Sequence, residues 1–521
     1  MILTLIRKEL LTNLLTLRLA VAVGFTVVLS VLTTFIGSLN YSQNLEAYQK
    51  EVRDVAEALD KASIYSQVEP RVVLPPQPLG ILCRGLWGPI GQAVYIDVGT
   101  IHRSSWSLSS AFDSAFMKTL IQIDFTTVVA LLLSFLAVAL GFDRICGERE
   151  SGTLKQLLTN PIPRAHVVLS KLLGGMISLW IPFALAFTIS LLIILTNADV
   201  TLGGEDWVRL GIFFVLSCLF LAQIFAFSLM VSTFTRHTDT ALIICLFAWL
   251  VGGIGYVNVL PSFSRYSTHE IPFQNYLDQQ RVYFEEFDRE MEEWDQNNPS
   301  PGEAYVRGLE NGGQLRYAHP DGYVWLAKRT AVEMDKRLEL ADRRYKARYA
   351  VEDVLAQEAY VVDRWSILSP FINYQALSYV LARTTLDDAF YLGAAGQRYR
   401  ETFISYLRGK NAFSSRRWFT DDPPDQEPMI ANPQEVTPEM LAADSPFMRK
   451  RLAWAQEQEK AARRDDRRQL DLTDMPKFGG SWERSLSASL GEMMPGFVVL
   501  LLSFGATVTM TFMRFWGYDP Q

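Results

Sequence analysis

The sequence LGIFFVLSCLFLAQIFAFSLMVSTF, from Leu210 to Phe234, runs for 25 residues without a charged side chain. A helix needs roughly 20 apolar residues to cross a hydrocarbon layer of about 30 Å. Inside that layer every backbone N–H and C=O group must find its partner within the protein, and an α-helix provides this. The stretch therefore predicts a membrane-spanning helix.

Five more runs, of 18 to 24 residues, are also free of charged side chains. Any one of them could be a buried helix of a large soluble core, but six such runs favour a membrane protein. The sequence thus predicts an all-α polytopic membrane protein. Its six transmembrane helices are expected at residues 19–39, 121–142, 172–195, 210–234, 240–260 and 491–514.

The charged residues gather in one part of the chain. The 521 residues include 49 Lys+Arg and 56 Asp+Glu, a formal net charge of −7, and residues 261–490 hold 31 of the basic and 37 of the acidic ones. This segment predicts a large, mainly helical domain outside the membrane. Its acidic run at 285–295 and basic run at 337–348 either pair or form solvated faces, and solvated faces are the favoured interpretation. Because neither the chain nor this segment is basic, a nucleic-acid partner is excluded.

The short loops indicate how the chain is oriented in the membrane. The loop at 143–171 has five basic residues, whereas the loop at 196–207 has three acidic residues and no basic one. By the positive-inside rule, the loop at 143–171 and both termini are expected in the cytoplasm. Residues 40–120 and 261–490 are then extracytoplasmic. Residues 1–18 predict an amphipathic helix along the cytoplasmic membrane face.

Motifs for catalysis are missing from the sequence. The only Gly-Lys pair, Gly409-Lys410, lacks the glycine-rich loop that precedes it in a P-loop, so we expect no ATP binding of that kind. The five histidines are scattered without the spacing of metal ligands. The G-x-S-x-G motif of serine hydrolases is also absent. We expect no enzyme activity, no catalytic residue, no metal and no cofactor in this chain.

Two single residues are of interest on the far side of the membrane. Asp124 adjoins the apolar run of the second span at its outer end. An ionisable group at membrane depth is a functional candidate, but an interfacial, solvated carboxylate is the favoured interpretation of this residue. Cys83 is the one cysteine expected on that side, so it cannot form an internal disulfide there. We expect it to be a small, buried apolar residue rather than a reactive thiol.

The most informative segment is GERESGTLKQLLTNPIPR, residues 147–164 of the predicted cytoplasmic loop. Its charged cluster, Glu148 to Glu150, lies just outside the membrane, and Gly152 permits a sharp turn. Leu154 and two later leucines give one apolar face to the short helix that follows. Such a helix either docks in a groove of a partner or rests on the membrane, and the spacing alone leaves both interpretations open.

The string DRICGERESGTLK, at 143–155, resembles the E-x-E-x-G-T-L signature of the type-2 family of ABC exporter permeases. Three further stretches are similar to the subgroup with a large outer domain, which is related to the gliding-motility and nitrous-oxide-reductase maturation permeases. These stretches are 75–86, 369–370 with 381–386, and 399–400. The resemblance covers almost the whole chain and is weakest at 274–363.

The resemblance implies a six-span permease subunit that dimerises as a homodimer or a heterodimer. A separate ATP-binding subunit beneath each permease would hold ATP and Mg²⁺. Residues 1–18 correspond to the elbow helix of the family. By residue-wise comparison, the ATPase-coupling residues are Glu148, Arg149, Glu150, Gly152, Thr153 and Leu154.

The expected location is the bacterial cytoplasmic membrane, in contact with membrane lipid. The expected function is export of a substrate, driven by ATP hydrolysis in the partner subunit. The alternative is a mechanotransmission subunit, which drives an accessory protein outside the cytoplasm without transporting a solute. Replacing Glu148 and Glu150 by Ala is expected to weaken ATPase association or coupling in either case.

Overall fold

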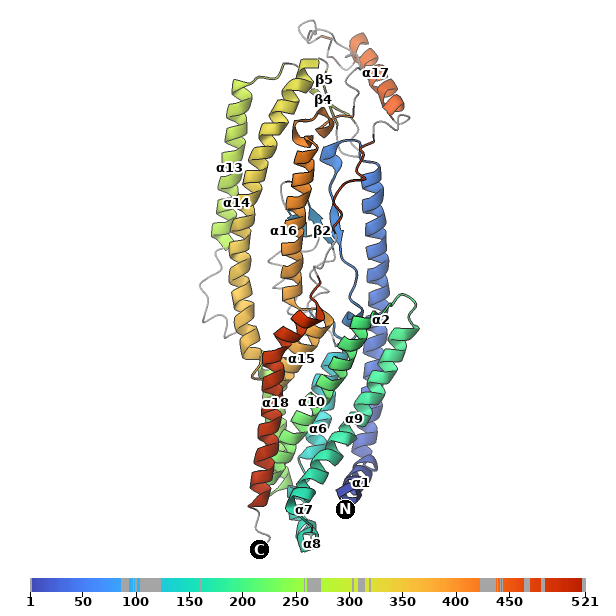
Figure 1. Ribbon diagram of the computed structural model, residues 1–521, viewed down its shortest axis with the longest axis vertical. Helices are drawn as coiled ribbons and strands as arrows, with labels where there is room; N and C mark the ends of the chain where they lie inside the picture. The colour runs from blue at the N-terminus through green and yellow to red at the C-terminus, as the bar shows by residue number, and fades with distance from the viewer. Residues whose placement is uncertain are drawn as a thin grey trace.

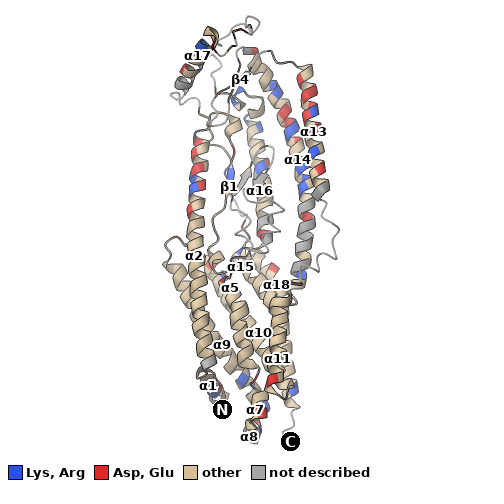
Figure 2. Ribbon diagram, turned by 180° about the vertical axis from the view of Figure 1, so that it is seen from behind, with Lys and Arg blue, Asp and Glu red and all other residues tan. Residues whose placement is uncertain are grey.

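The computed structural model is an elongated molecule with an apolar half and a polar half (Figure 1). In Figure 2 the charged residues gather in the polar half and at the opposite tip, whereas the helices between them are almost free of charge. The structure describes residues 2–85, 93–96, 98, 101–103, 123–159, 162–256, 258–259, 273–301, 304–307, 314–317, 320–421, 437, 439–440, 442, 444–462, 469–478 and 483–517. Residues 121–122 of the second predicted span, residues 257 and 260 of the fifth and residues 160–161 of the loop lie outside this set.

In the described part of the chain, six helical segments are long and apolar enough to cross a membrane. This confirms the predicted number of spans and the all-α polytopic class. The segments are α2 (Leu17–Asp60), a continuous run of α5 (Phe125–Thr127), η3 (Val128–Leu133) and α6 (Ser134–Gly141), α9 (Arg164–Thr196), α10 (Gly204–Phe234), α11 (Thr238–Trp249) with η4 (Leu250–Gly255), and α18 (Leu486–Trp516). Both η3 and η4 are π-helical. A first helix, α1 (Ile2–Leu14), packs against α9.

Helix α2 continues without a break from the apolar half into the polar half. It has 44 residues, although the first span was predicted to end at residue 39. Its first turn is capped by the Thr16 hydroxyl, which accepts a hydrogen bond from the Leu19 N–H. No proline interrupts it, and Gly37 allows close contact, since a Cβ there would lie 2.6 Å from the Ile81 carbonyl oxygen. The apolar span and the polar helix after it are therefore one rod.

Helix α15 (Pro370–Ala382) corrects the expectation that residues 261–490 lie wholly outside the span bundle. It packs among the spans, against α10 and α18. Tyr374 is fully buried, stacks on Phe220 of α10 at a centroid distance of 4.5 Å, and pairs its hydroxyl with Ser217 Oγ at 2.8 Å. Phe371 and Leu377 join the same apolar core. The chain thus enters the bundle at Ser369 and leaves it again at Arg383.

The polar half is mainly helical and has a small core of its own. Its core includes Met334, Phe403, Leu407 and Phe413. Its helices are the second part of α2, α13 (Phe273–Asn297), α14 (Pro320–Ser366), α16 (Leu386–Gly409) and α17 (Pro446–Ala462), with the short turns η1 (Tyr65–Gln67), η5 (Ala412–Ser414) and η6 (Arg416–Trp418). The turn η2 (Pro78–Ile81) contacts α15 and lies against Gly37 of α2.

Two small antiparallel sheets complete the polar half. The first has the strand order β1 (Arg71–Val73), β2 (Ala93–Ile96) and β3 (Ile101–Arg103), with Val72 opposite Val94 and Tyr95 opposite His102. The second pairs β4 (Ala304–Arg307) with β5 (Gln314–Tyr317). These strands are short, so the helices carry most of the fold.

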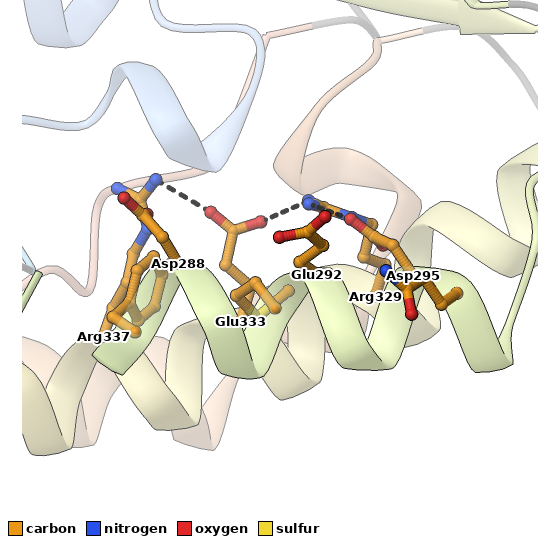
Figure 3. Close-up of a pocket in the computed structure, with 9 residues that line it drawn as sticks. Asp288, Glu292, Asp295, Arg329, Glu333 and Arg337 are labelled. Atoms are coloured by element: carbon orange, nitrogen blue, oxygen red, sulfur yellow. Dashed lines mark hydrogen bonds and ion pairs between the residues drawn. The ribbon is translucent and has the colours of Figure 1, made fainter. Parts of the chain in front are cut away.

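Helices α13 and α14 form a long antiparallel hairpin held by ion pairs (Figure 3). Arg329 donates to both carboxylate oxygens of Asp295 across the hairpin, at 2.7 and 2.9 Å, and to Glu333 on its own helix at 2.7 Å. Farther along, the Lys336 ammonium donates a hydrogen bond to Glu290 and lowers its pKa. Within the two predicted runs, Arg343 pairs with Glu286 at 2.7 Å, so the interpretation of the runs as solvated faces that do not pair is wrong. Each partly exposed pair contributes only about 0.2–1 kcal/mol.

Candidate functional site

The E-x-E-x-G-T-L segment forms two short helices at the tip of the apolar half. Helix α7 (Cys146–Glu150) ends before Ser151 and Gly152, and α8 (Thr153–Thr159) follows them. Gly152 has a φ of 75°, a left-handed conformation that favours glycine, as the predicted sharp turn requires. The N–H groups of Ile145 and Cys146 donate to Ser232 Oγ of α10 at 3.0 and 3.1 Å. The start of α7 is thereby fastened to α10.

Glu148 joins α7 to α9 and, through α9, to α1. Its Oε1 lies 2.7 Å from Lys171 Nζ, and the same ammonium lies 3.2 Å from Glu9 Oε1. Arg144 adds a weaker contact to Glu9, at 3.7 Å. Glu9 and Lys171 are both buried. Charges in a buried site need oppositely charged partners. These contacts join four residues into one ionic cluster, called here the inner cluster: Glu148, Lys171, Glu9 and Arg144.

Arg149 and Glu150 join α7 to the two helix ends beside it. Arg149 donates to the carbonyl oxygens of Thr235 and Thr233, at 2.9 and 3.4 Å, at the C-terminal end of α10. Glu150 accepts from the N–H and the hydroxyl of Thr238, at 3.2 and 2.6 Å, at the N-terminal end of α11. A cation at a helix C-terminus and an anion at an N-terminus both complement the helix dipole. The Glu-Arg-Glu cluster therefore connects α7 with four other helices.

Helix α8 buries its apolar side in this chain. Leu154 is fully buried in the core of the bundle, and Leu157 packs against the same core. The polar side chains of Thr153, Lys155 and Gln156 are exposed. Leu154 and Leu157 of the apolar face predicted for docking or for the membrane are thus covered by the bundle, whereas the side chain of Leu158 lies outside the described set. The exposed polar side chains are the ones left for a partner.

A second polar network, at the opposite end of α10, was not predicted from the sequence. Arg209 is only 1% exposed. It donates to Glu205 Oε1 at 2.7 Å, to the Leu381 carbonyl oxygen at 2.9 Å and to the Arg484 carbonyl oxygen at 3.1 Å. It therefore ties α10 to the end of α15 and the start of α18. The sequence does offer one indication of this network, because Arg209 stands directly before the charge-free run at 210–234.

Arg383 and Arg484 extend this network into the polar half. Arg383 lies 2.6 Å from Glu205 and 2.8 Å from Glu483, and its φ of 58° ends α15. Arg484 pairs with Asp388 at 3.3 Å, near the start of α16. We call the group of Arg209, Glu205, Arg383, Glu483, Arg484 and Asp388 the junction network.

Asp124 is buried, so its favoured interpretation as a solvated carboxylate is wrong. It caps α5 by accepting from the Thr127 N–H at 2.7 Å, and it also accepts from the Arg84 N–H at 3.0 Å. The neighbouring Cys83 is buried, as expected, and its carbonyl oxygen accepts from Thr384 Oγ1 at 3.1 Å. The predicted signature stretches at 75–86 and 381–386 thus meet beside Asp124.

The charged groups of these contacts were compared with the arrangement that a metal ion requires. Among the described residues, no three His, Cys, Asp or Glu side chains are grouped so that they could hold a metal ion. The inner cluster and the junction network consist of paired charges and hydrogen bonds that fasten helices together. Such an arrangement can transmit a movement between helices, and it holds no nucleophile aligned with a base.

Comparison with known proteins gives the family. The sequence pattern of the ABC-2 family transporter protein matches residues 3–399. Two relatives named Probable ABC transporter permease protein NosY are similar: that of Pseudomonas aeruginosa is 31% identical over 140 residues, and that of Stutzerimonas stutzeri 30% identical over 126.

These two alignments cover 26% and 24% of this chain, and 50% and 45% of the relatives, so the chain spans about half the length of the curated relatives it matches. Permeases of this family work with an ATP-binding partner and normally have no catalytic activity of their own. The family match, which extends over most of the chain, agrees with the resemblance inferred from 143–155 and with the six membrane helices. The chain belongs to the ABC-2 family of transporter proteins and is a multi-pass membrane permease subunit.

Proposed function

We propose that this chain couples ATP hydrolysis by a separate ATPase subunit to export of a substrate across the bacterial cytoplasmic membrane. In this proposal the tip formed by α7 and α8 and both termini are cytoplasmic, and the polar half is extracytoplasmic. The ATPase holds ATP and Mg²⁺, and a second permease subunit completes the transporter. The observation that carries the proposal is the set of contacts by which Glu148, Arg149 and Glu150 connect α7 to α1, α9, α10 and α11.

The contacts separate two tasks within the coupling segment. The exposed polar face of α8, with Lys155 and Gln156, is available to the ATPase. Glu148 and Arg149 instead contact α9 and α10 of this chain, and the half-exposed Glu150 contacts Thr238 of α11, so these three residues pass a movement of α8 on to the spans. Gly152 and Thr153 form the turn between the two parts, and Leu154 anchors α8 to the core.

Helix α10 provides the route through the membrane. Thr233 and Thr235 at its inner end are held by Arg149, and Arg209 at its outer end belongs to the junction network. Both ends are fixed by charge-assisted hydrogen bonds, which are worth about 1.5–3 kcal/mol each. A shift of α7 therefore displaces the start of α16 and the polar half above it.

A second candidate function is mechanotransmission without solute transport. The continuous helix α2 and the junction network favour it, because both convert movement of the spans into movement of the polar half. An accessory protein bound to that half would then receive the force. Export and mechanotransmission share the coupling step. In export a substrate crosses the membrane, whereas in mechanotransmission only the accessory protein is moved.

The coupling step is tested with the purified complex in proteoliposomes. We expect Glu148→Gln to keep the ATPase bound but to reduce coupled activity about tenfold or more, since it replaces the carboxylate that pairs with buried Lys171 by a neutral amide. The matched variant Lys155→Ala, on the exposed face of α8, should instead reduce recovery of the ATPase. If Glu148→Gln releases the ATPase while Lys155→Ala leaves both properties unchanged, the division of tasks is wrong.

The two candidate functions are separated in the same preparation. Substrate-stimulated ATPase activity with vectorial transport supports export, whereas stimulation only by an outer protein supports mechanotransmission. Orientation is tested with cysteines introduced at Lys155 and Glu290. Background labelling should be low, since Cys83, Cys146 and Cys245 are buried and the partly buried Cys218 lies in the apolar middle of α10. A membrane-impermeant maleimide should reach position 155 only from the cytoplasmic side and position 290 only from the other. The opposite pattern would exclude the proposed orientation.

A further inference from the structure

A groove of about 590 Å³ runs along the hairpin of α13 and α14 in the polar half (Figure 3). The described residues that line it come from successive turns of both helices, so the groove follows the helix axes. From Phe287 to Gln296 it extends for about 14 Å, or between two and three helical turns. Helix α13 lies at the edge of the molecule, with α14 on its inner side (Figures 1 and 2).

The floor of the groove is apolar. Met291 of α13 is only 5% exposed, and the half-buried Phe287 lies one turn before it. The guanidinium of Arg337, on α14, lies 5.8 Å from the centre of the Phe287 ring. A partner that covers this floor therefore needs apolar side chains along one of its sides, because such a contact removes apolar surface from water.

The charged groups around the floor are unbalanced. Four carboxylates and two guanidinium groups line the groove, which gives a formal charge of −2. Both cations already have partners, as the dashed lines in Figure 3 show. Arg329 pairs with Asp295 and Glu333, and Arg337 pairs with Glu333 at 2.8 Å. The groove thus has negative charge that its own arginines do not neutralise.

Two carboxylates, Asp288 and Glu292, carry this remaining charge. Both are exposed, and in the described part of the chain neither lies within ion-pair distance of a basic side chain. They are four residues apart on α13, so they are separated by about 6 Å along the helix axis. A partner can pair with both if it presents two basic side chains at the same spacing, as residues i and i+4 of a helix do.

We propose that the groove docks an amphipathic helix of a partner protein, with basic residues along one edge and apolar residues beside them. This third helix lies in the seam between α13 and α14 and covers the apolar floor, as a helix does in a groove. An extended peptide is less well matched, because α13 and α14 offer no sheet edge to its backbone. A second copy of this chain is poorly matched too, since a symmetric contact would place Asp288 and Glu292 against the same acids of the other copy.

The inference deepens the second candidate function, and it rests on that function only for the role of the partner, which is bound on the same side of the membrane as the polar half. Helix α14 runs from the groove to Ser366, four residues before α15 begins inside the bundle at Pro370. A partner in the groove is thus connected to the spans through one helix. Because binding requires neither ATP nor transport, failure of the partner to bind and failure of coupling are separate results.

The test uses the full permease–ATPase complex in nanodiscs of phosphatidylcholine, without nucleotide, and two synthetic helical peptides of about 18 residues. One has lysines at i and i+4 beside a leucine stripe and carries a benzophenone, and the other has glutamate in place of each lysine. We expect the lysine peptide to crosslink to the groove and to bind about tenfold more tightly than the glutamate peptide. Equal binding of the two peptides, or crosslinks only to other parts of the complex, would overturn the proposal.

Two matched double variants separate the groove from the general negative charge of the hairpin. Asp288→Asn with Glu292→Gln should weaken binding of the lysine peptide about tenfold, and it should not affect folding because both side chains are exposed and have no ion partner in the described chain. Glu293→Gln with Glu339→Gln removes the same charge from exposed positions outside the groove and should leave binding unchanged. An equal loss in both double variants would contradict the proposal. So would a disulfide between two permeases that carry Glu292→Cys, because the groove would then hold a second copy of this chain.

Discussion

Replacing Lys171 by Met is expected to weaken the inner cluster. Lys171 is buried, and its Nζ lies 2.7 Å from Glu148 Oε1 and 3.2 Å from Glu9 Oε1. Methionine keeps a long apolar stem but removes the ammonium between the two carboxylates. The variant therefore leaves two like charges without their shared partner, in a site with little access to water.

The distances give the size of the effect. With an effective dielectric constant of about 20, they correspond to Coulomb attractions of about 6 and about 5 kcal/mol. Dehydration of the ammonium offsets much of this, and removing one partner of a buried ion pair costs about 3–5 kcal/mol net. Glu148 keeps 23% of its side chain exposed, so we expect a loss of about 3 kcal/mol in the free energy of unfolding.

Equilibrium unfolding by sodium dodecyl sulfate in mixed micelles measures this loss. The control is the triple variant Lys171→Met, Glu9→Gln and Glu148→Gln, which has no net charge left on these three residues. It should recover a large part of the stability, because neutral side chains of similar shape replace a buried ion cluster at little cost. Recovery stays incomplete, since Arg144 loses its contact with Glu9. A single variant as stable as the unaltered protein, or a triple variant no better than the single one, would refute the reasoning.

Two further substitutions test other parts of the molecule. A Cβ at Gly496 would lie 2.4 Å from Asn373 Oδ1, so Gly496→Ala should lower the free energy of unfolding by about 1–3 kcal/mol. A Cβ at Gly505 meets open space, so Gly505→Ala should raise the free energy of unfolding by up to about 1 kcal/mol. The thermal unfolding midpoints of the two variants should therefore shift in opposite directions. In the polar half, a hydrogen bond from Lys410 lowers the pKa of Asp474. Such a carboxylate adds stability that is complete above its unfolded pKa of about 3.9 and is lost as pH falls through the folded pKa. Asp474→Asn should therefore destabilise the protein more at about pH 6 than at about pH 2 in unfolding experiments.

The sequence was sufficient to predict the six spans, because charged side chains are unfavourable in a bilayer and spanning segments are therefore long runs without charge. A charge-free run of this kind also covers α15, but it was not used to predict a helix inside the bundle. Residues 365–382 carry no charge for 18 residues, as many as the shortest run that was assigned to a span. They were overlooked because the segment around them, 261–490, is highly charged on average. A helix that packs inside the bundle is indicated by a short run without charge, even when the whole segment around it is highly charged.

The candidate site was predicted in part. The residues of the Glu-Arg-Glu cluster were identified, but their partners were not, because Glu9 and Thr238 are distant in sequence and only folding brings them to α7. Lys171 is one of the five basic residues of the loop at 143–171, and the sequence does not indicate that it pairs with Glu148 and Glu9. Asp124 was misread for the same reason, since its position in the chain does not reveal that Arg84 packs onto it.

The continuity of α2 affects how far a small change at one end is carried. At 1.5 Å per residue, 44 helical residues extend for about 66 Å, roughly twice the thickness of a bilayer. If such a lever pivots by about 5° at its inner end, its far tip sweeps sideways by about 6 Å. A modest tilt at one end of α2 thus becomes a sideways displacement about as wide as a side chain is long at the other end, about 66 Å away.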